Sequence, residues 1–301
     1  MGDVIRAATF AARCAELTEV RAANPAAIAE AAKGRARRSS WLGRDGRLLL
    51  VAADHPARGA LGAGDRPMAL ADRRDLLERV CTALARPGVD GVLATPDVLE
   101  DLLLLRVLDD KVVIGSMNRG GLVGSAFEID DRFTAYDAAS IAEHSLDGGK
   151  MLLRIDLEDP ASARALEGCA WAVSALAARG LMAMIEPFVA RREDGRLRNV
   201  LTPEAMTRAI AVASGLGATS AYTWLKVPVV DDMERVMAAS TLPALLLGGE
   251  VRERPWRDAR RWRRALALPT VKGLVAGRNL LYPPGDDVAG AVDAAVEVLR
   301  S

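Results

Sequence analysis

The sequence predicts a (β/α)8 TIM barrel, an α/β fold in which helices cover a closed ring of parallel strands. Eight short apolar runs, bounded by Gly, Pro or Asp, recur along the 301 residues. Segments with helical periodicity separate these runs, and the runs are too uniformly apolar to have a solvent-exposed face. At this length one closed barrel accommodates them all, so residues 1–301 are expected to form a single domain.

The expected strands are the apolar runs themselves. They cover residues 47–54, 89–95, 111–117, 150–156, 181–187, 222–228, 243–249 and 272–278. Intervening segments such as 71–88, 160–180 and 202–218 end at or next to a glycine, where a helix C-cap would lead into the next strand. A doubly wound open sheet is the alternative fold. However, the first run is followed by DHPARGALGAGDRP rather than by G-x-G-x-x-G, which argues against a dinucleotide site.

Residues 1–45 precede the first strand and are expected to form an N-terminal helical extension. Two helices are expected, over 4–23 and 25–38, which would either cap the bottom of the barrel or form an interface. The protein is expected to be a homo-oligomer. The first residues are mixed in charge and have no continuous apolar core, so they resemble neither a signal peptide nor a membrane span.

The composition argues against several classes of partner. The chain has 40 Lys and Arg against 40 Asp and Glu, so no general attraction to nucleic acid or to an anionic membrane is expected. Arg-dense stretches at 34–38, 190–198 and 254–264 are interpreted mainly as solvated helix or loop faces, with a phosphate-bearing ligand as the alternative. The three cysteines are widely spaced and the two histidines suggest no zinc site. We therefore expect a cytoplasmic protein that uses no metal or cofactor and acts on a small molecule.

In barrels of this kind, the residues that do chemistry lie at the C-terminal ends of the strands. The residues expected at this rim are Asp54, His55, Thr95, Ser116, Asn118, Arg119, Arg154, Asp156, Glu186, Lys226, Gly248, Gly249, Glu250, Gly277, Arg278 and Asn279. Strand ends are also simply exposed to water, which accounts for part of this set. The glycine-containing loop 116–127 would be either a lid over the site or a plain connection.

Lys226 is the most informative residue of this rim. The chain has only five lysines against 35 arginines, and Lys226 lies between Leu225 and Val227 in a run that should be buried. Burial disfavours the ammonium form and lowers the pKa of an amine. A neutral amine attacks carbonyl carbons and forms a Schiff base, whose iminium withdraws electrons from the adjacent carbon–carbon bond. The alternative is a structural lysine paired with a carboxylate such as Glu186.

Two further groups could move protons beside Lys226. Lys150 opens the fourth run, and a second cation there would lower the pKa of Lys226 further or transfer protons itself. Glu186 ends the fifth run among apolar neighbours, which is typical of a general acid/base with a raised pKa. The alternative for Glu186 is the salt bridge with Lys226.

The seventh and eighth runs end in LLGGE and VAGRN, which indicate an anion site. Gly248, Gly249 and Gly277 would let backbone N–H groups approach an anion, and Arg278 could add a bidentate contact. The loops after strands seven and eight are the usual phosphate seat of such barrels. Glycine at a strand end is also ordinary turn chemistry, and Glu250 is an unfavourable neighbour for a phosphate.

An ordered set of short motifs resembles the class I aldolases of the deoxyribose-phosphate and tagatose-bisphosphate aldolase superfamily. The motifs are VAADH, GGKMLLRID, MIEPF, WLKVP, LLGGE and GLVAGRN, which follow the family's order over roughly residues 46–290. The resemblance implies that Lys226 is the Schiff-base lysine and that Lys150 and Glu186 are its proton-transfer partners. It also implies that Asp54 orients substrate hydroxyls and that Gly248, Gly249, Gly277 and Arg278 bind a phosphate.

The resemblance has departures that bear on the substrate. Residues 54–56 read Asp-His-Pro instead of the Asp-Gln-Arg common in the tagatose branch, and Glu250 follows the glycines of the seventh strand. The chain looks closest to a bacterial branch often linked to inositol catabolism. This would imply cleavage of a phosphorylated deoxy-keto sugar acid into a three-carbon ketose phosphate and an aldehyde. Alternatives on the same fold are a Schiff-base transaldolase or decarboxylase, or a barrel that binds a sugar phosphate without turnover.

Overall fold

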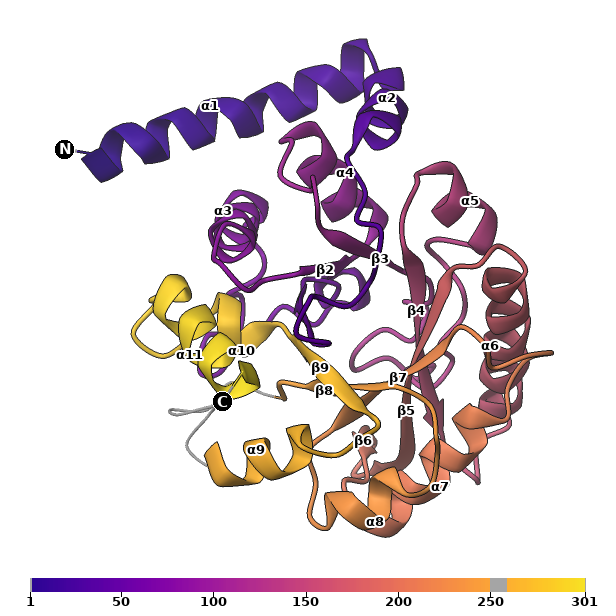
Figure 1. Cartoon of the computed structure of the whole chain (residues 1–301). Coiled ribbons are helices and arrows are strands. Elements are labelled where there is room, and N and C mark those ends of the chain that lie inside the picture. The colour runs from indigo at the N-terminus through magenta and orange to yellow at the C-terminus, as the bar shows by residue number, and fades with distance from the viewer. Residues whose placement is uncertain (1, 250–258, 301) are drawn as a thin grey trace.

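In the computed structural model of the chain, which describes residues 2–249 and 259–300, parallel strands close into a ring (Figure 1). The strands of the ring are β1 (Leu48–Ala52), β2 (Gly91–Ala94), β3 (Val112–Ser116), β4 (Gly148–Ile155), β5 (Met182–Glu193), β7 (Thr223–Pro228), β8 (Ala244–Leu247) and β9 (Val271–Ala276). Their order is β4-β3-β2-β1-β9-β8-β7-β5, and pairing of β4 with β5 closes the ring. Each of the eight expected runs overlaps one of these strands, so the predicted (β/α)8 barrel is confirmed, although β4 and β9 begin before their runs and β5 extends beyond its run.

Helices cover the outside of the ring. They are α3 (Arg73–Leu84), α4 (Pro96–Leu104), α5 (Ala138–Glu143), α6 (Ala161–Ala177), α7 (Pro203–Ser214), α8 (Met233–Met237), α9 (Ala259–Leu266), α10 (Arg278–Leu281) and α11 (Val288–Arg300), with the 3-10 turn η1 (Pro56–Arg58) after β1. Their starts follow local chemistry: the side chain of Asp72 accepts a hydrogen bond from the backbone N–H of Asp75 at 3.1 Å, which satisfies a free donor in the first turn of α3.

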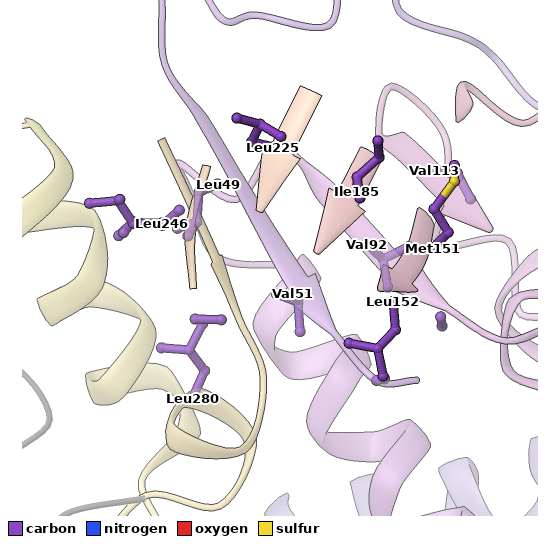
Figure 2. Packing of buried hydrophobic residues seen from close by; sticks show 14 of the residues in the cluster. Leu49, Val51, Val92, Val113, Met151, Leu152, Ile185, Leu225, Leu246 and Leu280 are labelled. Carbon is purple, nitrogen blue, oxygen red and sulfur yellow. The ribbon is translucent and has the colours of Figure 1, made fainter. Parts of the chain in front are cut away.

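Strand residues alternate between two hydrophobic cores. The smaller core fills the inside of the ring and consists of Leu48, Leu50, Ala52, Leu93, Val112, Ile114, Met182, Met184, Trp224, Leu245 and Val275. The larger core lies between the ring and the helices, and it contains the intervening strand residues, such as Leu49, Val51 and Leu225 (Figure 2). Successive side chains of a strand point to opposite faces, so each apolar run supplies both cores. This explains why the runs lack a polar alternation.

The N-terminal extension closes the bottom of the barrel, but not with its helices. α1 (Gly2–Ala23) and α2 (Ala26–Gly34) lie outside the ring beside α3 and α4 (Figure 1). The segment that follows them carries Trp41 and Leu42, which pack against the inner core, and the ring of Trp41 meets that of Trp224 edge-on at 6.2 Å between centroids. The alternative role as an interface, and the expected homo-oligomer, stay predictions.

Arginines tie this segment to the N-terminal ends of the strands. Arg35 donates to the carbonyl oxygen of Lys111 at 2.8 Å and pairs with Asp147 at 3.3 Å, and its side chain is 1% exposed. Arg38 pairs with Asp90 at 2.9 Å. The Arg-dense stretch 34–38 is therefore not simply a solvated face, because its arginines hold the closing segment in place.

We expect Trp41→Ala to lower the free energy of unfolding by about 2–4 kcal/mol, because it removes a large ring from the floor of the inner core and leaves a cavity there. Trp171→Ala is the matched control, since the Trp171 side chain on α6 is 72% exposed and its loss should have little effect. Urea denaturation of both variants measures the difference. Equal losses for the two variants would contradict the role of Trp41.

A hairpin not anticipated from the sequence extends β5. The strand continues to Glu193, turns at Asp194 and Gly195 and returns as the antiparallel strand β6 (Arg196–Asn199). Both turn residues have positive φ, of 49° and 74°, as a two-residue hairpin turn requires. The stretch 190–198 is thus solvated as expected, but as a hairpin rather than as a helix or loop face. Of the third Arg-dense stretch, 254–264, residues 254–258 lie outside the described residues.

Within residues 2–249 and 259–300, no helix is both long enough and apolar enough to cross a membrane.

Candidate active site

The four side chains expected to do chemistry come together inside the ring. The Nζ atom of Lys226 on β7 lies 3.0 Å from Oε1 of Glu186 on β5. The Nζ atom of Lys150 on β4 contacts the other oxygen of Glu186, Oε2, and also lies 3.3 Å from Oδ2 of Asp54, just after β1. Lys150, Asp54 and Lys226 are buried, and the Glu186 side chain is 12% exposed. One carboxylate is therefore shared by two lysines.

The alternation of the strands explains this meeting. Glu186 lies two residues after Met184 and Lys226 two residues after Trp224, so both share the inward face with the smaller core. Lys150 is in register with Met184 across the β4–β5 pairing, which turns its side chain to the same face. Because parallel strands end at one edge, side chains that follow the inner core meet at the C-terminal end of the ring.

Arg119 and Ser116 extend the cluster at the end of β3. A terminal nitrogen of Arg119, Nη2, contacts Oδ2 of Asp54, and its Nε donates to the hydroxyl oxygen of Ser116 at 2.9 Å. The hydroxyl group of Ser116 in turn donates to Asp54 at 3.2 Å. Arg119, Asp54, Lys150, Glu186 and Lys226 thus form a row of contacting groups whose charges alternate in sign. We call these five residues the charge chain.

The amines of the charge chain are held toward their neutral form. Burial lowers the pKa of Lys226, against the opposing attraction of Glu186, and the positive charges of Arg119 and Arg278 lower it further. Burial lowers the pKa of Lys150 well below its ordinary value, and Arg119 adds to this effect. With every group ionised, the charge chain holds three positive and two negative charges. Loss of one proton from a lysine balances it.

The expectation of a raised pKa for Glu186 is wrong. Burial alone would raise the pKa of this carboxyl, but the positive charges of Lys150 and Lys226 and the hydrogen bond from Lys150 hold it well below its usual range. Glu186 is therefore ionised at neutral pH and holds no proton to donate. The sequence showed its apolar neighbours along the strand, but not the two cations that face it from β4 and β7.

His55 lies between the charge chain and the glycine loops. Burial lowers the pKa of His55 well below its ordinary value, and the charges of Arg278 and Lys226 add to this, so the imidazole is neutral. Its Nδ1 atom is buried and has no hydrogen-bond partner among the described residues. A Cβ on Gly277 would lie 2.9 Å from His55 Cε1 and 2.6 Å from the carbonyl oxygen of Ala52, so this glycine admits the ring.

The expected anion-binding residues meet where β8 and β9 end. Asn279 Nδ2 donates to the carbonyl oxygen of Gly248 at 2.8 Å, which joins the two loops, and a Cβ on Gly248 would lie 2.7 Å from that nitrogen. Gly249 has a φ of 73° and open space where a Cβ would be. Arg278 makes no hydrogen bond or ion pair with any described residue, and its Nε atom is buried. The expected neighbour Glu250 lies outside the described residues.

The loop after β3 is fixed over this end of the ring. Asn118 donates to the carbonyl oxygen of Leu152 at 2.6 Å, and its own carbonyl oxygen accepts from the backbone N–H of Leu152 at 2.7 Å. Arg154, 3% exposed, binds both carboxylate oxygens of Asp131 at 2.6 and 2.8 Å and also contacts Glu128. These contacts fix the start of the expected loop 116–127 and the residues that follow it, while the role of the loop as a lid or a plain connection stays a prediction.

Arg119, Ser116 and His55 belong to the polar rim read from the sequence, but nothing along the chain distinguished them from other strand ends. Their importance comes from contacts between β1 and β3, which only the folded ring supplies. Among residues 2–249 and 259–300, no group of three His, Cys, Asp or Glu side chains is placed to hold a metal ion.

Comparisons with known proteins place this geometry in context. A family model described as Cgl0159-like matches residues 46–296. The crystal structure of Cgl0159 from Corynebacterium glutamicum has 50% sequence identity, covers 95% of this chain and 96% of its own, and superimposes with a TM-score of 0.92. A comparison with curated proteins gives no match.

Two aldolase structures are similar at lower identity. A Schiff-base-forming fructose-1,6-bisphosphate aldolase has 20% identity, covers 86% of this chain and 96% of its own, and has a TM-score of 0.64. An archaeal fructose-1,6-bisphosphate aldolase, solved with its catalytic Lys covalently bound to the carbinolamine intermediate, has 18% identity, coverage of 87% and 97%, and a TM-score of 0.65. At these identities the likeness establishes a shared barrel fold.

Proposed function

Because the chain belongs to the Cgl0159-like family and shares its barrel fold with Schiff-base-forming aldolases, we propose that it is a class I aldolase, an aldehyde-lyase. The observation that carries the proposal is the position of Lys226. Its amine is buried at the C-terminal end of a barrel strand, and its only carboxylate partner among the described residues is shared with a second lysine. Such an amine is kept from full protonation and is a nucleophile toward carbonyl carbons.

The reaction follows from the groups beside Lys226. The neutral amine attacks the carbonyl carbon of a ketose or keto sugar acid, and loss of water gives an iminium ion. The carboxylate of Glu186 takes the proton of a substrate hydroxyl, either directly or through Lys150. The carbon–carbon bond then breaks and the aldehyde leaves. The electron pair of the broken bond stays with the fragment on Lys226 and converts its iminium into an enamine. Protonation of the enamine and addition of water release the ketone product and restore the free amine.

The remaining expected residues would hold the substrate. Arg278, which has no partner among the described residues, would bind an anionic group together with Gly248, Gly249 and Gly277. Asp54, which contacts Lys150, would orient a substrate hydroxyl. A phosphorylated deoxy-keto sugar acid, cleaved to a three-carbon ketose phosphate and an aldehyde in inositol or other sugar catabolism, fits these groups.

We expect borohydride to trap the Schiff base. Incubation with dihydroxyacetone phosphate and borohydride should leave a mass adduct on the peptide that contains Lys226, because reduction converts the imine into a stable secondary amine. Omission of the ketose phosphate is the first control, and Lys33, which is exposed, is the internal control. An adduct on another lysine, or none with any ketose phosphate or keto acid, would count against the proposal. Analysis of released products separates cleavage from transaldolase or decarboxylase chemistry.

One contact favours a second candidate, a barrel that binds a sugar phosphate without turnover. The 3.0 Å contact of Lys226 with Glu186 is the pairing that a structural lysine would make. On this alternative the protein would bind dihydroxyacetone phosphate through Arg278, but neither an adduct nor any released aldehyde would appear. Calorimetric titration of the ketose phosphate, alongside the borohydride experiment, separates the two candidates.

A further inference from the structure

The charge chain ends at Arg119, which differs from its other members in one respect. Burial lowers the pKa of Arg119 to about 10, so the guanidinium remains charged at neutral pH, while the two lysines are driven toward the neutral form. Arg119 is 6% exposed and is held from two sides, by Asp54 and by Ser116. It is therefore a fixed positive charge inside the barrel.

A fixed positive charge at this position affects how many protons the other four residues of the charge chain hold. With Arg119 present, Asp54 and Glu186 supply two negative charges against one fixed and two variable positive charges. Neutrality is reached when one lysine is deprotonated. Without Arg119, the same two carboxylates would match two protonated lysines in number, which removes one of the causes that drive an amine toward its neutral form. A net buried charge is costly, so the balanced state is favoured in each case.

We propose that Arg119 is a positioning residue of this active site. It holds Asp54 in place and keeps its own proton, so that the group of the charge chain that is deprotonated is a lysine. The inference rests on the proposed role of Lys226 as nucleophile, because a neutral amine matters only if it reacts. The side-chain contacts of Arg119 are with Asp54 and Ser116, and not with the amine of Lys226. Arg119 acts through its contact with Asp54, from which the row of contacts continues to Lys150 and Glu186, and through its charge, which also reaches Lys226.

The groups that face Lys226 come from five elements around it. They are Glu186 on β5, Lys150 on β4, Arg119 after β3, His55 after β1 and Arg278 on α10. His55 is neutral and adds no charge. A bound anion would neutralise the charge of Arg278, so Arg278 would lower the pKa of Lys226 less once substrate is bound. Arg119 is already paired within the protein, and its effect persists through the reaction.

The geometry also explains why an arginine is suited to this place. Its planar guanidinium presents Nη2 to Asp54 and Nε to Ser116 together, which fixes the orientation of the carboxylate toward Lys150. A lysine would supply one ammonium group and could itself lose the proton. The charge would then be shared among three amines instead of being fixed at one end.

The small number of lysines allows a direct test by NMR. With five lysines in the chain, protein grown with lysine carrying 13C at the ε carbon gives at most five signals, whose pH titration reports each amine. The Lys226 and Lys150 signals are assigned from their methionine variants. In Arg119→Met, we expect the titration midpoints of both lysines to move upward by about one pH unit, because one nearby positive charge is lost. Arg119→Lys should move them less.

Arg35→Met is the matched control, since Arg35 is also a buried, ion-paired arginine but lies at the opposite end of the barrel. It should leave both midpoints unchanged. Unchanged midpoints in Arg119→Met and Arg119→Lys, with a retained fold, would overturn the proposal, as would an equal shift in Arg35→Met. If Arg119→Met fails to fold, Arg119→Gln and Arg119→Lys give the same comparison.

The NMR experiment is independent of the borohydride experiment. Midpoints that shift in Arg119→Met, in a protein that forms no adduct with a ketose, would support the role of Arg119 in proton placement while rejecting the aldolase. An adduct on Lys226 with midpoints that do not shift would support the aldolase while rejecting the role of Arg119.

Discussion

Lys226→Met is expected to reduce carbon–carbon bond cleavage by about 10³-fold or more while leaving the protein at least as stable as the unmodified chain. The loss of activity follows because methionine cannot form an imine. The retained stability follows from charge, since the variant keeps Arg119, Asp54, Lys150 and Glu186, two positive and two negative groups. A buried amine, costly to bury whether charged or neutral, is replaced by an apolar side chain while Glu186 keeps its pairing with Lys150, so a gain of about 1–3 kcal/mol in the free energy of unfolding is expected.

Aldehyde release and urea denaturation at neutral pH measure the two effects of Lys226→Met separately. Lys33→Met is the control, because Lys33 is exposed on α2 and should affect neither quantity. A loss of stability as large as that from a broken buried ion pair would mean that Lys226 serves the fold. The structural reading of its contact with Glu186 would then be preferred.

Glu186→Leu is expected to have the opposite effect on stability, lowering the free energy of unfolding at pH 7 by about 3–5 kcal/mol. The variant leaves Lys150, Lys226 and Arg119 with only Asp54 as a negative partner. Two adjacent variants in one cluster thus change stability in opposite directions, which a simple count of ion pairs would not predict. Glu193→Leu is the control, since Glu193 and its partner Arg198 are both more than half exposed and their pair contributes little.

The pH dependence of the Glu186 contribution has a definite sign. The pKa of Glu186 in the folded protein lies below its value in the unfolded chain, which is about 4.3. The folded state therefore binds the proton less readily, and the stabilisation is fully present above that pH and is lost as the pH falls below it. Denaturation curves of the unmodified protein and of Glu186→Leu should converge as the pH is lowered from 5 toward 3. A difference that stays constant over this range would contradict an ionised Glu186.

The barrel could be predicted because its strands are buried on both faces. The inner and outer cores draw on alternate residues of every run, so the runs read as uniformly apolar and are easily recognised. The hairpin of β5 and β6 was missed for the opposite reason. Its residues are largely exposed and arginine-rich, and they resemble a solvated loop, although Asp194 followed by Gly195 is a typical hairpin turn.

The position of the site could be predicted, but its electrostatics could not. The alternation of β5 and β7 places Glu186 and Lys226 beyond the inner core, and this can be read along each strand. The direction of the pKa shift of Glu186 depends on which charges face it across the ring, and these come from other strands. Likewise, Arg119 and Asp54 follow two different strands, β3 and β1, and their contact forms only in the folded ring.

The closing segment at the floor of the barrel has a consequence for biosynthesis. The ribosome makes Trp41 and Arg47 before any strand exists, yet their partners appear much later: Trp224 on β7, and the backbone oxygens of Leu266 and Val271, which accept from Arg47 at 2.9 Å. The N-terminal segment must therefore wait, with an indole ring unburied, until nearly the whole polypeptide has emerged. Such long delays between synthesis and burial expose a nascent chain to aggregation, so chaperone binding to the first 50 or so residues would be of benefit.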